Sequence, residues 1–117
     1  MHHPMSLSSP WYEHVASGRK RYEGRRLTAA TTAIAQGDTI TFKHHTDPLL
    51  PSHSHTVVAV HVFPCFRAAL EALPLDQVLP DVASVEEGCE VYERYVSLPT
   101  QLRYGVVMLE LSSLGNT

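Results

Sequence analysis

Apolar and polar residues alternate along several short segments of the chain, a pattern that predicts β-strands. In the segment 39–42, Ile40 and Phe42 fall on one face and two threonines on the other. The segment 56–63 is apolar at nearly every position, so we expect it to be buried on both faces or to lie in a closed barrel. The expected strands cover residues 20–27, 39–42, 56–63 and 104–111.

Apolar residues spaced three and four positions apart predict three helices. The first begins at Pro10 and ends at Gly18, because glycine commonly stops helices. The second follows Pro64, and the third follows Ser84, whose hydroxyl can accept a hydrogen bond from the first turn. The segment 28–35 stays open between helix and strand, because its alanines favour a helix and its threonines do not.

The order of these elements is helix, strand, strand, strand, helix, helix, strand, which lacks the regular alternation of a doubly wound sheet. We therefore predict an α+β domain with a small, mostly antiparallel sheet or barrel. The 117 residues suffice for one domain with its own core. We expect that domain to cover residues 9–112, with a flexible N-terminal tail at 1–8 and a C-terminal tail at 113–117.

The composition is that of a globular protein, with 44% hydrophobic and 18% charged residues. No apolar stretch reaches half of the roughly 20 residues that a membrane helix needs, so we expect no membrane contact. The net charge is −3, but residues 1–45 carry six basic and three acidic side chains, whereas residues 46–117 carry three and nine. Five of the nine basic residues lie at 19–26, which predicts either an anion-facing patch or a solvated strand face.

The chain has two cysteines, Cys65 and Cys89, and its first ten residues do not resemble a secretory leader. We therefore expect both to be reduced thiols that pack on the inner faces of helices. This cysteine usage indicates a cytoplasmic protein, with the nucleus as the alternative compartment.

Four histidines, His44, His45, His53 and His55, flank a proline-containing loop. Their spacing matches no standard set of metal ligands. We therefore expect a mobile polar loop there, no metal site and no cofactor. His61 lies among apolar residues, and we expect its ring to be hydrogen-bonded within the barrel.

The octet Gly18–Arg25 resembles the G-x-K-x-x-E-x-R signature of the ASCH domain, a member of the PUA-like superfamily. Further segments resemble the same family in the same order, from about Pro10 to Leu111. They are the turn and strand at 34–42, the helix entry at 63–66, the segment 78–81, the capped helix with Tyr92 and Tyr95, and the strand start at 104–107.

The resemblance implies a small PUA-like β-barrel with about three flanking helices. It also implies a cleft between the first helix and the barrel, lined by the signature residues Lys20, Glu23 and Arg25. Members of this family are thought to handle RNA or modified nucleosides, as binding modules or as enzymes. The resemblance therefore makes RNA or a modified nucleoside the expected partner.

The three signature side chains can do two kinds of chemistry in one cleft. Lys20 and Arg25 can hold a phosphate, the arginine through its planar fork and the lysine as a point charge. Alternatively, Glu23 can act as a general base beside a desolvated Lys20. The purely structural alternative is a surface ion pair between Glu23 and Arg25.

Aromatic residues near the octet offer surfaces on which a base can stack. Trp11 and Tyr12 precede it directly, although Trp11 can equally pack the first helix onto the barrel. We expect Tyr92 in the core and the Tyr95 hydroxyl in the cleft. The expected ligand- or RNA-binding residues are Lys20, Glu23, Arg25, Arg19, Trp11 and Tyr95.

The leading hypothesis is that the cleft binds RNA or a modified nucleoside. The alternative is a small hydrolase with Lys20 and Glu23 as catalytic residues, either a ribonuclease or a nucleoside amidohydrolase. The amidohydrolases of this resemblance remove the acetyl group of acetylcytidine with a lysine, a threonine three residues later and a distant carboxylate. Glu23 stands in place of that threonine, and Asp81 could supply the carboxylate. A third reading, favoured by the net negative charge, is a protein-binding adaptor without a nucleic-acid role.

Overall fold

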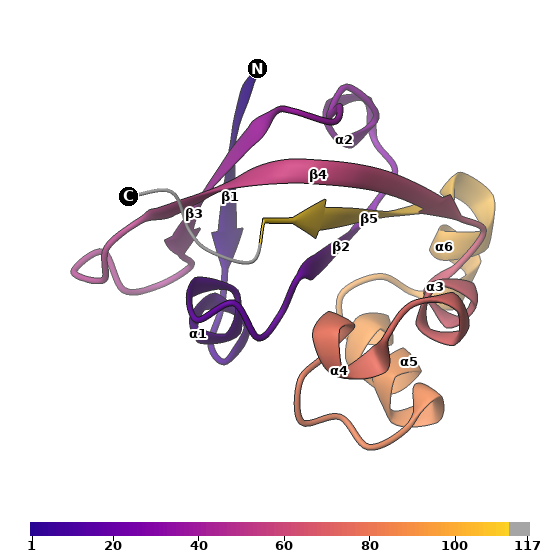
Figure 1. Cartoon of the computed structure of the whole chain (residues 1–117). Helices are drawn as coiled ribbons and strands as arrows, with labels where there is room; N and C mark the ends of the chain where they lie inside the picture. The colour runs from indigo at the N-terminus through magenta and orange to yellow at the C-terminus, as the bar shows by residue number, and fades with distance from the viewer. Residues whose placement is uncertain (113–117) are drawn as a thin grey trace.

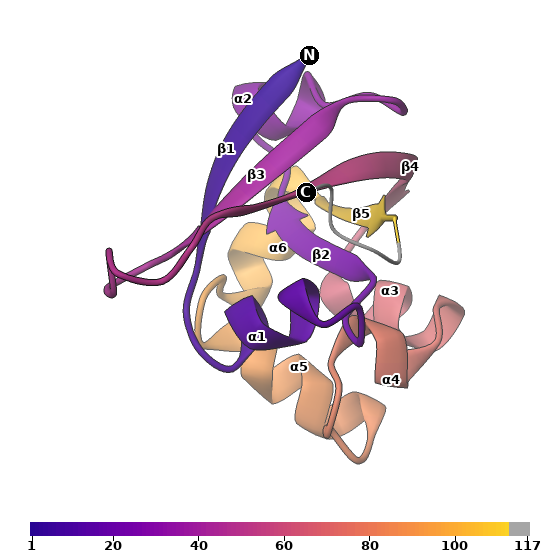
Figure 2. The ribbon, with the colours of Figure 1, turned by 60° about the vertical axis from the view of Figure 1, so that its left-hand side comes forward.

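The protein folds around one curled, five-stranded sheet. The structure is a computed structural model that describes residues 1–112. The strands lie in the order β1-β3-β4-β5-β2, and every neighbouring pair is antiparallel except β1 and β3. Their bounds are β1 His2–Leu7, β2 Tyr22–Arg26, β3 Thr39–His44, β4 His53–Phe63 and β5 Val106–Leu111. The α+β class is therefore confirmed, but the sheet is an open half-barrel with β1 and β2 as its edges (Figures 1 and 2).

Six helices surround the sheet in the described residues, and our expectation of about three was wrong. Their bounds are α1 Trp11–Ala16, α2 Ala29–Thr32, α3 Phe66–Ala72, α4 Leu75–Val78, α5 Val85–Glu93 and α6 Leu98–Tyr104. Figure 1 shows α3, α4, α5 and α6 gathered on one side, with α1 and α2 at opposite ends of the curled sheet. None of the helices in residues 1–112 is long and apolar enough to cross a membrane.

The N-terminal residues form strand β1, which corrects the expected flexible tail at 1–8. This strand pairs in parallel with β3, from His2 opposite Thr39 to Leu7 opposite His44. Leu7 is buried in the core, and this burial ties the segment to the sheet. The expected C-terminal tail at 113–117 lies outside the described residues.

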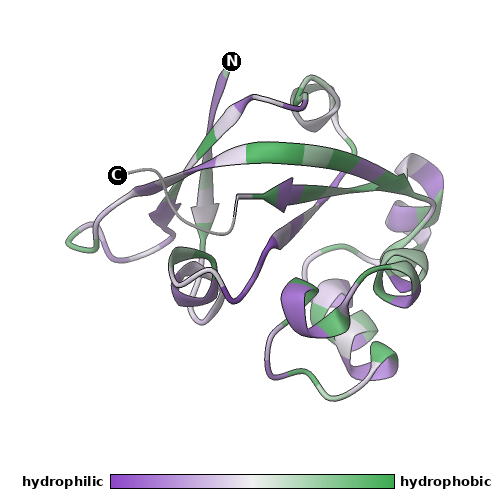
Figure 3. Ribbon diagram, viewed as in Figure 1, coloured by the Kyte–Doolittle hydropathy of each residue, from purple (hydrophilic) through white to green (hydrophobic). Residues whose placement is uncertain are grey.

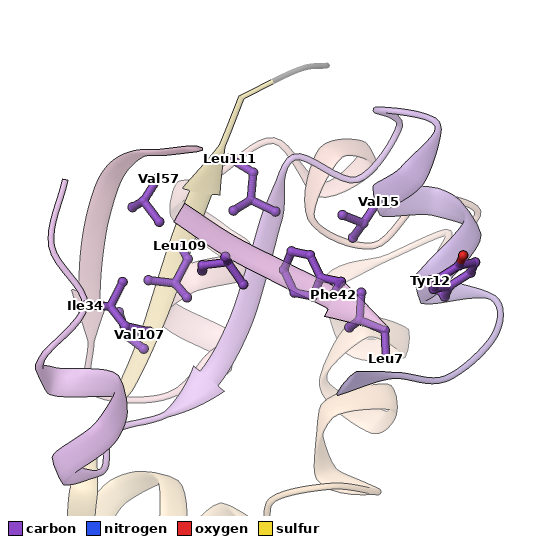
Figure 4. Close-up of a cluster of buried hydrophobic side chains, with 10 residues drawn as sticks. Leu7, Tyr12, Val15, Ile34, Phe42, Val57, Val107, Leu109 and Leu111 are labelled. Carbon is purple, nitrogen blue, oxygen red and sulfur yellow. The ribbon is translucent and has the colours of Figure 1, made fainter. Parts of the chain in front are cut away.

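Two hydrophobic clusters lie on the two sides of β5, so this strand is buried on both faces. Val107, Leu109 and Leu111 face the inside of the curled sheet, where they meet residues of β3, β4 and α1 (Figure 4). Val106 and Met108 face the opposite cluster, which α3, α4 and α5 cover. Hydrophobic residues therefore follow β4 and β5 through the middle of the molecule (Figure 3).

Strand β4 is not buried on both faces, contrary to our expectation. Val57 is fully buried, but Val58, Val60 and Val62 are exposed, Val62 by 62%. β3 pairs with β4 only over residues 53–56, so no described strand lies beside the rest of β4 on that side. The face of β4 that carries these three valines is therefore turned toward solvent.

The two cysteines are free thiols, but only one of them packs as expected. Cys89 lies on α5 against the helical cluster. Cys65 is the N-cap residue of α3, so it precedes the helix and does not lie on its inner face.

Candidate functional site

A cavity of about 560 Å³, the cleft, lies along the free edge of β2. Because β2 is an edge strand, residues from both of its faces line the cavity, and five residues at 20 and 23–26 do so. Further walls come from the end of β1, from α1, α2 and α3, and from α5 with the residues after it. Figure 2 shows α1 beside β2. The cleft is therefore wider than the predicted space between the first helix and the barrel.

The three signature side chains converge in this cleft. The Arg25 Nε donates a hydrogen bond of 2.7 Å to Glu23 Oε2. On the other side, Lys20 Nζ lies 3.7 Å from Glu23 Oε1. Lys20 and Glu23 are only 3% and 6% exposed, so the carboxylate is held between two cations away from bulk water.

Lys20 directs its ammonium group into the protein. Its Nζ donates hydrogen bonds to the carbonyl of Tyr22, at 2.6 Å, and to the carbonyl of Val78. Burial lowers the pKa of Lys20 to about 8, and the Glu23 carboxylate opposes that shift. With two carbonyls and one carboxylate around its three donors, Lys20 orients Glu23 and does not project toward a ligand.

Arg25 connects the cleft to the N-terminal strand. Its Nη2 donates a hydrogen bond of 2.9 Å to the carbonyl of Ser6 at the end of β1. The arginine side chain is 31% exposed, so part of the guanidinium still faces the cleft opening. An arginine has five N–H donors, and the two groups it contacts leave donors free for an anion.

Two stacked aromatic rings form the helical wall. Phe66 of α3 and Tyr92 of α5 lie with their ring centroids 3.9 Å apart and their planes 3° from parallel. The Tyr92 hydroxyl is buried and has no hydrogen-bond partner within residues 1–112. Burial raises the pKa of Tyr92 well above its usual value, so the hydroxyl keeps its proton. A buried hydroxyl without a partner costs free energy, so this arrangement is retained at the expense of stability.

Gly24 allows these rings to approach β2. A Cβ atom at this position would lie 2.8 Å from the Phe66 ring and 2.8 Å from the Tyr92 hydroxyl. The prediction that Tyr92 lies in the core is confirmed, but the sequence did not indicate that Tyr92 also lines the cleft. The available signal was Gly24 itself, because a glycine inside a strand often marks a close approach of another group.

Comparison with known proteins gives structural relatives only. No family model and no curated protein matches the chain. Among solved structures, the hypothetical protein PH0355 is 29% identical, with a TM-score of 0.86 over 99% of this chain and 100% of that one. Protein PF0455 from Pyrococcus furiosus is 33% identical, with a TM-score of 0.75 over 96% of each chain. ASCH from Zymomonas mobilis is 16% identical, with a TM-score of 0.66 over 96% of this chain and 68% of that one.

The chain belongs to one family with protein PF0455, and its fold is that of an ASCH domain. The resemblance stated from the sequence is therefore confirmed. In this ASCH fold, the octet 18–25 supplies the turn after α1 and most of β2.

The ASCH fold brings some predicted residues to the cleft and leaves others outside. Trp11 lines it, and Tyr95 lies at its mouth with 64% exposure. Arg19 does not line the cleft, because its guanidinium pairs with Asp81 at 2.8 Å on the surface. This pairing also removes Asp81 as the distant carboxylate. Tyr12 turns toward the sheet, where its hydroxyl donates to a backbone carbonyl in the loop before β4.

The histidines take different places in the ASCH fold. His53 and His55 belong to β4, not to a loop, and their rings contact through Nδ1 and Nε2 at 2.9 Å. His61 is hydrogen-bonded as predicted, to Glu110 at 3.0 Å. His45 lines the cleft, which the sequence did not indicate. In residues 1–112, no three histidine, cysteine or acidic side chains are grouped as metal ligands.

Proposed function

We propose that this ASCH-fold protein binds a nucleobase, of RNA or of a modified nucleoside, in the cleft. The observation that carries the proposal is the buried Glu23 carboxylate, held by Lys20 and Arg25 in a cavity with aromatic walls. A group of this kind orients a planar polar ligand, while the aromatic and apolar walls bury its faces.

The size and lining of the cleft support a ligand of nucleoside size. Small-molecule sites typically enclose about 300–1,000 Å³, and the cleft holds about 560 Å³. Trp11 and Tyr95 border it, and an aromatic side chain contributes about 1–3 kcal/mol for each base that stacks on it.

The polar groups indicate which edge of a base would face Glu23. A carboxylate only accepts hydrogen bonds, and it has about four lone-pair sites. Arg25 and Lys20 use part of this capacity. The remaining sites favour a ligand that presents N–H donors, such as an exocyclic amine. Tyr92 lines the same cavity with its ring, while its hydroxyl is buried against Gly24.

Binding measurements with labelled single-stranded RNA and with free nucleosides test the proposal. We expect Glu23→Gln to weaken binding about 10- to 100-fold, because a hydrogen bond to a charged group contributes about 1.5–3 kcal/mol. Glu86→Gln, on the exposed start of α5, is the matched control and should bind as the original protein does. Equal affinities for the two variants would contradict the proposal.

Two further pairs of variants distinguish the role of Arg25 in binding from that of Lys20. Arg25→Gln should weaken binding and reduce its salt dependence, because this residue offers the free donors for a phosphate. Arg67→Gln, an exposed arginine of α3, is its control. Lys20→Met should weaken binding by releasing Glu23, whereas Lys43→Met on the exposed face of β3 should not. Behaviour on a nucleic-acid column that does not depend on salt would argue for the adaptor reading instead.

A nucleoside amidohydrolase is the second candidate, favoured by a lysine with a pKa of about 8 beside a carboxylate in the cleft. In this reaction Glu23 would take a proton from water, and the hydroxide would add to the acetyl carbon of acetylcytidine. The C–N bond then breaks, and the proton passes to the leaving amine, which gives cytidine and acetate. Incubation with acetylcytidine and with short RNA, followed by product analysis, distinguishes the candidates. Binding without turnover would support ligand binding as the function of the cleft and contradict the amidohydrolase.

A further inference from the structure

A second groove, the Tyr104 groove, adjoins the cleft on the side of α2 and α6. Its lining residues are Arg26, Leu27, Thr28, Ala29, Thr32 and Tyr104. Arg26 and Thr28 line both the groove and the cleft, so the two are continuous on the surface. The Thr28 side chain also caps α2, and this fixes the shared wall in place.

Planar and cationic side chains meet in this groove. The Arg26 guanidinium lies 5.2 Å from the centroid of the Tyr104 ring, and the Arg103 guanidinium lies 5.3 Å from it. The ring is 47% exposed at the end of α6. Neither arginine forms an ion pair with a carboxylate in the part of the chain that the structure describes. Both guanidinium groups therefore form cation–π contacts over the Tyr104 ring, and no described carboxylate neutralises their charges.

This combination matches the chemistry of a nucleotide. Bases of single-stranded RNA stack on aromatic rings and on guanidinium planes. Phosphates accept paired hydrogen bonds from arginine. A protein with a net charge of −3 has no general attraction for polyanions. A local pair of arginines without carboxylate partners therefore indicates a specific site for an anionic ligand.

We propose that the Tyr104 groove holds the nucleotide next to the one in the cleft, so that the ligand is a segment of single-stranded RNA and not a free nucleoside. This inference rests on the proposed binding of a nucleobase in the cleft. The base stacks on the guanidinium planes that lie over Tyr104, and the ring holds these planes in position. Arg26, which borders both spaces, contacts the phosphate that joins the two nucleotides.

The test compares one nucleotide with several. Affinities are measured for hexa-adenylate, hexacytidylate and hexauridylate and for the corresponding 5′-monophosphates. We expect the preferred hexamer to bind at least about tenfold more tightly than its monophosphate, because the second base adds a stacking contact. Tyr104→Ala should remove this advantage and leave the affinity for the monophosphate unchanged.

Matched variants connect the effect to the ring and the charges. Tyr104→Phe keeps the ring and should retain the affinity for the hexamer. Arg103→Gln should reduce the salt dependence of hexamer binding. Leu102→Ala changes a neighbouring exposed residue of the same helix and should have no effect. The melting temperature of each variant shows that it is folded.

The outcomes separate the inference from the proposed function. If monophosphates bind in a Glu23-dependent way but the hexamers bind no more tightly, the Tyr104 groove is not a nucleotide site and the function of the cleft stands. If Tyr104→Ala lowers the affinity for the hexamer and for the monophosphate equally, the same conclusion follows. If neither monophosphates nor hexamers bind, the proposed function fails and the inference fails with it.

Discussion

At the scale of single residues, the cleft stays open because Gly24 has no side chain. Gly24 lies in the middle of β2, where a larger residue would meet the stacked rings of Phe66 and Tyr92. In a sequence, a glycine inside a strand reads as a weak point or a bend. The structure gives it a positive role, because it lets the backbone of β2 border the cavity.

Gly24→Ala should therefore lower both stability and binding. The added methyl group would lie 2.8 Å from the Tyr92 hydroxyl and 2.9 Å from the sulfur of Met108, so these buried groups must shift. Overpacking of this kind typically costs about 1–3 kcal/mol. Urea unfolding measures the loss of stability, and RNA titration measures the loss of binding. An unchanged free energy of unfolding would show that the rings move aside freely.

The three central site residues could be predicted from the sequence, but their surroundings could not. Lys20, Glu23 and Arg25 lie within six positions, so local spacing and the family resemblance sufficed to place them together. Arg19 belongs to the same octet, yet its partner Asp81 is 62 positions away. Local sequence carries no information on such a contact, and the prediction that Arg19 binds the ligand has no support in its position.

At the scale of elements, β4 contains two histidines, the buried His55 and the half-buried His53, whose protonation opposes folding. His53 and His55 share one face of the strand, and both rings lie near Phe42, with centroids 5.8 and 5.9 Å from its ring. Burial lowers the pKa of both, and for His53 the neighbouring His55 adds to the shift. The neutral imidazoles are therefore the forms that fit the folded protein.

This arrangement predicts a loss of stability in mild acid. Both histidines have a pKa below the ordinary 6.5 in the folded protein, so the unfolded chain binds protons first as the pH falls. The free energy of unfolding therefore has its full value above about pH 6.5 and decreases as the pH falls below it. We expect a lower free energy of unfolding at pH 5.5 than at pH 7.5. His55→Gln should weaken this dependence, and the exposed His45→Gln should preserve it.

Several helices and one strand could not be predicted from the sequence. Helices α2 and α4 have four residues each, which is too short for a helical periodicity to be recognised. Helix α6 was not expected either, and Pro99 lies in its first turn after the capping residue Ser97. Strand β1 could not be predicted because its parallel partner β3 lies more than thirty positions away.

At the scale of the whole molecule, the cleft joins the two halves of the chain. Its basic and acidic residues come from β2, whereas its aromatic wall comes from α3 and α5. The bond from Arg25 to Ser6 adds the N-terminal strand to the same site. The uneven charge that the sequence revealed corresponds to this division, since the basic half supplies β2 and the acidic half supplies α3 and α5.

Because its walls come from all parts of the chain, the cleft exists only in the fully folded molecule. Any compound that occupies it must delay melting, by about 2.7 kcal/mol when its concentration is one hundred times its dissociation constant. For a domain of this size, that corresponds to a rise on the order of 10 °C. A thermal-shift screen of a nucleoside library thus reads out occupancy without any label. Glu23→Gln, screened in parallel, distinguishes occupants of the cleft from compounds that stabilise the fold elsewhere.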